Sequence, residues 1–360
     1  MSRVDVVVAG SGPAGSAAAV VLARAGVSVH LLATDRSRHG WAGESLPPGA
    51  EALIEAVFGD GILTEPPHVR AYGVRGAWGS ADLVDTDFMS HPLGDGWHLD
   101  RAVFDRQICA AAAAAGAVIA HGQGVTGVER TPWGWQVQTG MASLEARWVV
   151  DATGRAGAVV GRLGIPRTRL DRQIAEVAVV GDADQAAVTT IEAAPDGWWY
   201  STPVPGGRRV VAFLTDVDLW NRGQEGGAAF AERLAATIHI ANLVDEVGQG
   251  IVSRSYPADT SRRAQLTGRR WAAVGDSAIT WDPLSSQGIV SGVLMGARVA
   301  SAIVESLGSG SSEALLTWED DYRLLLDEHT GLRAYYATAE QRWPESPFWR
   351  RRSVSDARLA

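Results

Sequence analysis

The stretch that decides the fold is Val4–Gly26, VDVVVAGSGPAGSAAAVVLARAG. An apolar run leads into three glycines, and the residues that follow them have helical spacing. Gly10 permits a tight turn, Gly12 lets a pyrophosphate approach the backbone, and Gly15 lets helix and strand pack closely. The stretch therefore predicts a strand, a phosphate-binding turn and a helix whose N-terminus faces the phosphates of a dinucleotide.

The second strand of this unit lacks the acidic residue that usually binds the ribose. Val27–Leu32 is the predicted strand, and Ala33 stands at the ribose-binding position, where an acid is expected about 20 residues after the first glycine. Asp35 comes two residues later and can substitute only if the loop curls back. We therefore expect adenosine binding to be weaker than usual or to depend on another residue.

Composition places the chain among ordinary globular proteins. Its 360 residues are 46% hydrophobic and 20% charged, which suits two domains or one α/β unit with an inserted layer. The net charge of −9 argues against a nucleic-acid partner. The uncharged stretch of small and apolar residues at Ile108–Ala120 is shorter than the roughly 20 residues of a membrane span, so no membrane-spanning helix is expected. The single cysteine, Cys109, predicts a reducing, cytoplasmic location.

Two features of composition bear on chemistry. The chain has 14 tryptophans, and its 32 basic residues are all arginine. Because arginine keeps its proton near neutral pH, no side-chain amine is available as a base or nucleophile. The histidines show no metal-ligand spacing, so we expect no metal site.

Four further segments carry a family resemblance. They are Gly96–Asp105 before an alanine-rich helix, Val149–Arg155, Trp271–Ser277, and Asp282–Ile289 at the start of a helix. With the opening motif they resemble the FAD-dependent monooxygenase superfamily, which includes aromatic hydroxylases, tryptophan-halogenase-like proteins and geranylgeranyl reductases. The landmarks extend over most of the chain and occur in the order that the family has.

The resemblance implies an α/β fold. It has a Rossmann-type FAD-binding domain (glutathione-reductase-like, of the aromatic hydroxylase type), an inserted and mostly antiparallel sheet as substrate domain, and a C-terminal helical cap. The expected parts are an FAD-binding domain of residues 1–75, 96–165 and 255–305, a substrate domain of 76–95 and 166–254, and a helical region of 306–360. The residue pattern predicts strands at Val69–Trp78, Ile174–Val180, Ala187–Ala194, Gly197–Pro203 and Arg209–Asp216, and helices at 226–247 and Trp318–Ala339.

The resemblance implies FAD as cofactor and assigns roles by position. Arg101 would reach the phosphates, Asp276 the ribityl or pyrophosphate region, and Pro283–Gly288 the isoalloxazine ring. A helix start beside that ring suits the negative charge of reduced flavin. The expected cofactor-binding residues are Gly10, Gly12, Pro13, Ala14, Gly15, Arg101, Asp151, Gly154, Gly275, Asp276, Pro283, Gln287, Gly288 and Ile289.

Three details resemble one branch of the superfamily. Gly43–Pro48 is similar to a loop of halogenase-like proteins, and Trp198–Pro203 to their Trp-x-Trp-x-Ile-Pro strand, with tyrosine and threonine at two of its four defined positions. The tail Arg342–Arg352, together with Gly96–Asp105, looks most like flavoproteins that mature tryptophan-derived quinone cofactors. Halogenases of this type use a lysine to hold or carry hypohalous acid, and this chain has none.

The resemblance therefore implies an FAD-dependent monooxygenase. Reduced FAD and O₂ would form a C4a-hydroperoxide that hydroxylates an electron-rich ring, indole or tryptophan in type, free or bound in a peptide or protein. The expected catalytic residues are Glu44 as base, if a dry pocket raises its pKa, and Trp198 and Tyr200 as pocket walls. His98 and Asp100 are further acid–base candidates. Other candidate pocket walls are Trp41, Trp78, Trp97, Trp199 and Trp281.

Three alternatives and the electron source stay open. The chain could be a maturation factor that modifies tryptophan in a partner protein, or a flavin-binding protein without turnover. A flavin-dependent halogenase-like protein is a further alternative, which the absence of lysine disfavours. Asp151-Ala-Thr-Gly154 replaces the Asp-Gly motif with which many single-component hydroxylases dock NADPH. The resemblance therefore favours reduced flavin from a separate flavin reductase, or slow direct reduction by NAD(P)H.

Overall fold

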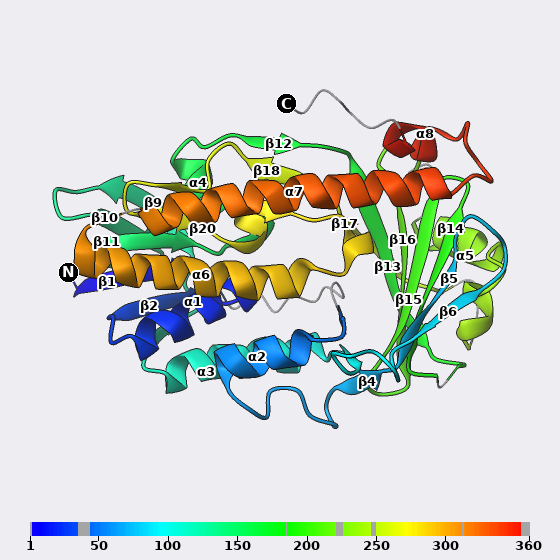
Figure 1. Ribbon diagram of the computed structural model, residues 1–360, viewed down its shortest axis with the longest axis horizontal. Helices are drawn as coiled ribbons and strands as arrows, with labels where there is room; N and C mark the ends of the chain where they lie inside the picture. The colour runs from blue at the N-terminus through cyan, green and yellow to red at the C-terminus, as the bar shows by residue number, and fades with distance from the viewer. Residues whose placement is uncertain are drawn as a thin grey trace.

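The computed structural model describes residues 2–34, 44–184, 186–220, 226–245, 250–311 and 313–353. Two large sheets form its frame, one at each end of the elongated molecule in Figure 1. Asp35 and Trp41, both named in the sequence analysis, lie outside the described residues.

The first sheet is the predicted dinucleotide-binding unit. Its main path runs β19-β20-β11-β1-β2-β8, with β2, β1, β11 and β20 in parallel, and β9 and β10 extend it from β11. The strands are β1 (Ser2–Ala9), β2 (Val29–Ala33), β8 (Val118–His121), β9 (Val125–Arg130), β10 (Trp135–Thr139), β11 (Ser143–Asp151), β19 (Thr267–Gly268) and β20 (Trp271–Ala273). The central strand β1 is an apolar run because helices cover both faces of such a sheet.

The second sheet has seven strands and is the predicted inserted layer. Its order is β17-β13-β16-β15-β14-β5-β6, and every neighbouring pair is antiparallel except β14 and β5. The strands are β5 (Gly73–Ala77), β6 (Val84–Asp87), β13 (Gln173–Gly181), β14 (Val188–Ala194), β15 (Gly197–Val204), β16 (Arg208–Asp216) and β17 (Ser253–Pro257). Two small sheets complete the set: β3 (Ser45–Leu46), β7 (Gly96–His98) and β4 (Val69–Ala71), and β12 (Arg167–Arg169), β18 (Ser261–Arg263) and β21 (Ile279–Thr280).

Helices cover the first sheet and join it to the second. The α-helices are α1 (Pro13–Arg24), α2 (Ala50–Phe58), α3 (Arg101–Ala114), α4 (Ala158–Arg162), α5 (Gly226–Ala235), α6 (Gly288–Ser309), α7 (Glu313–Ala339) and α8 (Pro347–Ser353). The short 3₁₀ turns are η1 (Gly154–Ala156), η2 (Ile240–Leu243), η3 (Gly275–Ser277) and η4 (Pro283–Ser285). Figure 1 shows α7 running along the molecule from the first sheet to the second.

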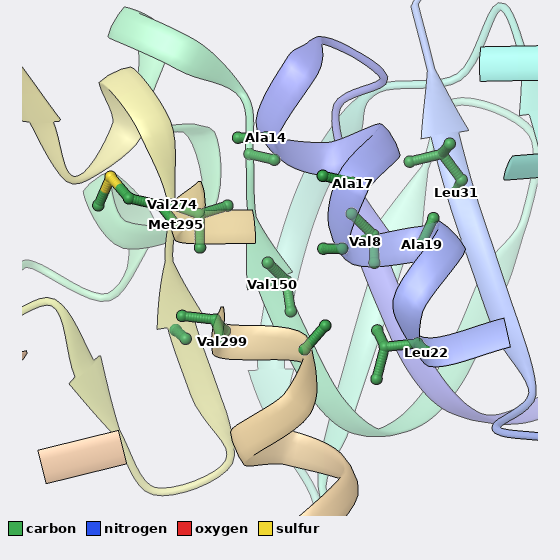
Figure 2. Packing of buried hydrophobic residues seen from close by; sticks show 14 of the residues in the cluster. Val8, Ala14, Ala17, Ala19, Leu22, Leu31, Val150, Val274, Met295 and Val299 are labelled. Carbon is green, nitrogen blue, oxygen red and sulfur yellow. The ribbon is translucent and has the colours of Figure 1, made fainter. Parts of the chain in front are cut away.

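Small residues bring α1 and α6 close together. A Cβ on Gly296 would overlap the carbonyl oxygen of Ala14, and Gly292 lies against the same residue. Figure 2 shows side chains of both helices gathered around Val8 and Val150 of the sheet beneath them. Among the described residues, α6 is the one helix long and apolar enough to cross a membrane, and half of its most apolar window is buried inside the fold.

Several predicted boundaries change. Val69–Trp78 divides into β4 and β5, which belong to different sheets. The seven-stranded sheet takes β5 and β17, so it begins before residue 76 and continues past residue 254. Strand pairing, which is not local in sequence, sets these limits. The helix expected at 226–247 is instead α5 followed by η2.

Candidate functional site

One cavity lies between the two large sheets, and distant parts of the chain line it. Gly12, Arg101 and Asp276 all contribute to its wall, and so do Glu44 and Tyr200 on the side of the seven-stranded sheet. The segments that sequence motifs singled out therefore meet at one place. The predicted cofactor-binding residues that line the cavity are Gly12, Pro13, Ala14, Arg101, Gly154, Gly275, Asp276, Pro283, Gln287, Gly288 and Ile289.

Two helices begin at this cavity and leave their first amide groups available. α1 starts at Pro13 and α6 at Gly288, and within the described part of the chain neither has a side-chain cap or an acid in its first turn. Uncapped helix starts need hydrogen-bond acceptors and favour negative charge. The cavity therefore suits a dinucleotide with two anionic parts, such as the pyrophosphate and the reduced ring of FAD.

The glycines at the cavity wall leave room for a bound group. A Cβ added to Gly12 or Gly288 would meet no atom within 4 Å. Gly10 and Gly15 act differently and do not line the cavity. Gly10 has a φ of 108°, and a Cβ on either residue would overlap backbone atoms of the β1–α1 turn or its neighbour Ala152. These two glycines therefore shape the turn, as the motif predicts, without touching the cavity.

Asp151 is, with Gly10 and Gly15, a predicted cofactor residue that does not line the cavity. Its side chain is fully buried and does not line the cavity. One carboxylate oxygen accepts hydrogen bonds from Val159 N and Val160 N at 2.8 Å, and the other from the backbone and hydroxyl of Thr153. The carboxylate thus holds the start of α4 against the end of β11. We assign it a structural role in place of the predicted cofactor contact.

Charged side chains gather around the nucleotide side of the cavity. Arg101 begins α3 and forms an ion pair with Asp105 at 3.2 Å. Asp276 lies in η3 with its carboxylate 3.8 Å from the guanidinium of Arg155. Arg167 donates a hydrogen bond to the carbonyl oxygen of Asp276 at 2.7 Å, which holds this turn in place. The arrangement offers positive charge for phosphates and one carboxylate for hydroxyl groups.

Glu44 is a buried carboxylate in the cavity wall, near both Arg101 and Tyr200. Its side chain is 2% exposed, and its Oε1 has no hydrogen-bond partner among the residues that the structure describes. Burial raises the pKa of Glu44 from 4.5 to about 7, although the nearby positive charge of Arg101 opposes the shift. Near neutral pH, Glu44 therefore exchanges a proton easily, as a general base must.

A chain of hydroxyl groups runs from the cavity wall into the protein beside Glu44. The hydroxyl groups of Tyr200 and Ser45 lie 2.7 Å apart, and Ser45 Oγ lies 3.3 Å from Thr202 Oγ1. Thr202 Oγ1 is 2.6 Å from Nδ1 of His98. Burial raises the pKa of Tyr200 and lowers that of His98 to about 4, so both side chains are neutral at physiological pH.

Sequence reasoning did not join Ser45, Thr202 and His98 into one group. Tyr200 and Thr202 share a face of β15, because side chains alternate along a strand. Ser45 and His98 are paired between β3 and β7, a contact that only the small sheet creates. The alternation was the one signal available in the sequence. Asp100, the other acid–base candidate, caps α3 by accepting a hydrogen bond from Val103 N.

The remaining predicted wall residues divide between faces of the sheet. Trp198, Tyr200 and Trp281 line the cavity. Trp199 points to the reverse face and packs against Phe213 with ring centroids 4.8 Å apart. Trp78 and Trp97 do not line the cavity. The apolar wall on this side consists of Ala175, Val177, Val210, Ala212 and Leu214.

Known proteins of similar sequence and structure agree with this fold. The FAD binding domain family matches residues 3–41. Over 375 residues the chain is 27% identical to the "Putative FAD-dependent oxidoreductase LodB" of Marinomonas mediterranea, with 99% of each chain covered. The flavin-dependent halogenase CmlS is 22% identical with a TM-score of 0.87, covering 98% of this chain and 68% of CmlS. QhpG, a peptidyl tryptophan dihydroxylase essential for tryptophylquinone cofactor biogenesis, is 22% identical with a TM-score of 0.81, covering 98% and 79%. These likenesses confirm the predicted α/β fold with its Rossmann-type FAD-binding unit.

Proposed function

We propose that the chain, which is similar to an FAD-dependent oxidoreductase and to flavin-dependent halogenases, hydroxylates the indole ring of a tryptophan held in a peptide or protein. The observation that carries the proposal is the juxtaposition of two sites in one cavity. Two uncapped helix starts suit FAD, and Glu44 lies near Tyr200 of the apolar, aromatic wall.

The wall of the cavity supports a bound tryptophan over the free amino acid. Free tryptophan carries an ammonium and a carboxylate group, and each needs a polar partner when it leaves water. Among the described lining residues of β13, β15 and β16, none is charged. An indole side chain on a polypeptide brings only its ring to this wall, where Trp198 and Tyr200 offer aromatic faces. The likeness to QhpG, whose name describes action on peptidyl tryptophan, agrees with this choice.

Hydroxylation is favoured over halogenation by the side chains present. The resemblance associates halogenation with a lysine beside the substrate, and the chain contains no lysine. Glu44 supplies a base in place of an amine, and a base is what ring hydroxylation needs. A separate flavin reductase, or NAD(P)H directly, would provide the electrons.

The chain's own residues then have defined tasks. When bound, reduced FAD supplies the activation of O₂. The bound cofactor would supply the two electrons that reduce one oxygen atom to water, while the other oxygen atom adds to a ring carbon that must lose its proton. Glu44 accepts that proton at Oε1, while Tyr200, held by Ser45, orients the ring. The apolar wall keeps water from the reacting atoms.

The proposal is tested by product mass. The purified protein is given FAD, a separate flavin reductase with NADH, air, and either free tryptophan or a blocked tryptophan peptide. We expect the mass of one or two oxygen atoms to be added to the peptide and not to the free amino acid. Glu44→Gln should abolish the gain, whereas Glu305→Gln, an exposed control on α6, should retain it.

Three other outcomes would overturn parts of the proposal. Product from free tryptophan alone would refute the peptide-bound substrate. Incorporation of bromine when bromide is added would refute the choice of hydroxylation. No product from either substrate, with flavin shown to be bound by its absorption spectrum, would favour a flavin-binding protein without turnover.

A further inference from the structure

One row of side chains crosses the seven-stranded sheet from the cavity to an open edge. Residues paired between neighbouring strands point to the same face of a sheet. From the cavity outward, the register aligns Val177, Ala212, Tyr200, Ile191, Gly76 and Val84, which we call the edge row. The first three residues line the cavity, so the row continues the wall that faces the proposed reaction.

The edge row becomes more exposed with distance from the cavity. Val177 and Ala212 are buried, Ile191 and Gly76 are partly exposed, and Val84 is 65% exposed. A Cβ on Gly76 would meet no atom within 4 Å, which leaves space above the middle of the row. β6, which carries Val84, is the last strand of its sheet, and all four of its residues are exposed. The row therefore ends at an exposed edge of the sheet.

Two exposed apolar side chains follow β6 along the chain. Met89 is 82% exposed and Leu93 is 64% exposed, close in sequence to Val84. The carbonyl oxygen of Leu93 accepts a hydrogen bond from Gly49 N at 3.1 Å, which ties this loop to the segment that begins with Glu44. The loop that carries Leu93 therefore adjoins the segment that carries the proposed base.

The charge around the open end is negative. Between residues 73 and 95 the chain has one arginine, Arg75, and four aspartates, Asp82, Asp85, Asp87 and Asp95. Asp85, although it forms an ion pair with Arg75 at 3.2 Å, keeps 69% of its side chain exposed. A second copy of the chain docking by the same edge would bring these acids against its own. A basic partner meets no such repulsion.

We propose that the edge row binds an extended segment of the protein that carries the target tryptophan. Apolar residues of that segment flank the tryptophan, and a basic residue lies about four positions away. The distance follows from the sheet: three strand steps separate β15 from β6, or about 14 Å, which about four extended residues span. The inference rests on the proposed function and adds to it the chemistry of the partner segment.

The test measures binding without turnover. The FAD-loaded protein is titrated with a dansyl-labelled nonapeptide that has tryptophan at its centre, valines beside it and arginine four positions away on each side. A second peptide has glutamates in place of the arginines. We expect the arginine peptide to bind at least tenfold more tightly, with the difference shrinking as salt is added.

Two substitutions place an obstacle in the edge row and one serves as control. Gly76→Leu fills the open space in the middle of the row, and Val84→Glu adds a charge at its end. Each should weaken binding of the arginine peptide at least tenfold. Val118→Glu makes the same change on β8, the edge strand of the first sheet, at a residue that is 53% exposed, and should leave binding unchanged. FAD affinity is measured in every variant to show that it has folded.

The outcomes separate this inference from the proposed function. The role of the edge row would be overturned by any of three results. Gly76→Leu and Val84→Glu could bind the arginine peptide as well as wild type does, the arginine and glutamate peptides could bind equally, or neither peptide could bind to protein that holds FAD. If any of those results were found and the protein still hydroxylated a single tryptophan residue with blocked termini, the proposed function would be retained. Tight, row-dependent binding without any oxygenated product would support the docking surface and overturn the hydroxylation.

Discussion

Replacing Glu44 with glutamine should change how stability depends on pH. Burial raises the pKa of Glu44 from 4.5 to about 7, and the side chain is only 2% exposed. In the unfolded chain the carboxyl group titrates at its ordinary value. Between these two pKa values the folded state holds a proton that the unfolded state has lost. The contribution of Glu44 to stability therefore falls as the pH rises through this window and is constant above it.

The size of the effect follows from the shift. Linkage makes the raised pKa of Glu44 lower the unfolding free energy by about 3 kcal/mol at pH 8, where the group is ionised, and by about 1 kcal/mol at pH 5, where the folded protein holds it protonated. Glutamine has no charge to bury. The difference in unfolding free energy between Glu44→Gln and wild type should therefore grow by about 2–3 kcal/mol in favour of the variant from pH 5 to pH 8. Activity should move the other way, because the base is gone.

Guanidinium unfolding of the flavin-free proteins, followed by tryptophan fluorescence at both pH values, measures this difference. Turnover is measured over the same range, where wild type should rise through pH 7 and the variant should be flat and about 10²–10⁴-fold slower. The exposed control Glu305→Gln should follow wild type in both assays. Parallel stability curves for Glu44→Gln and wild type would refute the account of a buried, proton-accepting carboxylate.

Three further substitutions test the cofactor side, the hydroxyl chain and the C-terminal helix. Gly12→Ala, which adds a methyl group to the cavity wall, should lower FAD affinity at least tenfold in a flavin titration with Tm unchanged, and an unchanged affinity would contradict the proposed contact. Ser45→Ala removes the 2.7 Å contact with Tyr200 and should slow turnover about tenfold without changing FAD binding, whereas equal loss of both would indicate a structural defect. Arg352→Met removes the partner that lies 2.6 Å from the buried carboxylate of Asp216, and should lower the free energy of unfolding, measured with denaturant, by about 3 kcal/mol. An unchanged free energy of unfolding would show that Arg351 alone is enough to pair with Asp216.

The parts of the fold that depend only on residues close together in the sequence could be predicted from the sequence. The turn at Gly10–Gly15 needs glycine for backbone reasons, and those reasons apply wherever the segment lies. Gly206-Gly207 between two strand-like runs predicts a hairpin, and the structure has β15 and β16 joined there. Val69–Trp78, by contrast, is one apolar-rich run in the sequence and two strands in the structure. Nothing within the run shows that its halves pair with different partners.

The candidate site shows the same division. Motif order brought Gly12, Arg101 and Asp276 into one list, because each marks a turn or helix start with a local pattern. Asp151 was included on the same grounds, yet its carboxylate is used entirely within the turn that follows β11. A motif locates a residue but does not show which way its side chain points. Local motifs could not predict the contact between Ser45 and His98, since 53 residues separate them in the sequence.

By itself, the sequence determined that the chain begins with a dinucleotide-binding unit and that it has no lysine to act as an amine base. Both are properties of residue identity and short-range geometry. Only the tertiary structure decided that Glu44 is buried with a raised pKa, and that one row of the sheet leads outward from it. A pKa depends on the dielectric surroundings and a row depends on register, and both arise when distant strands pack together.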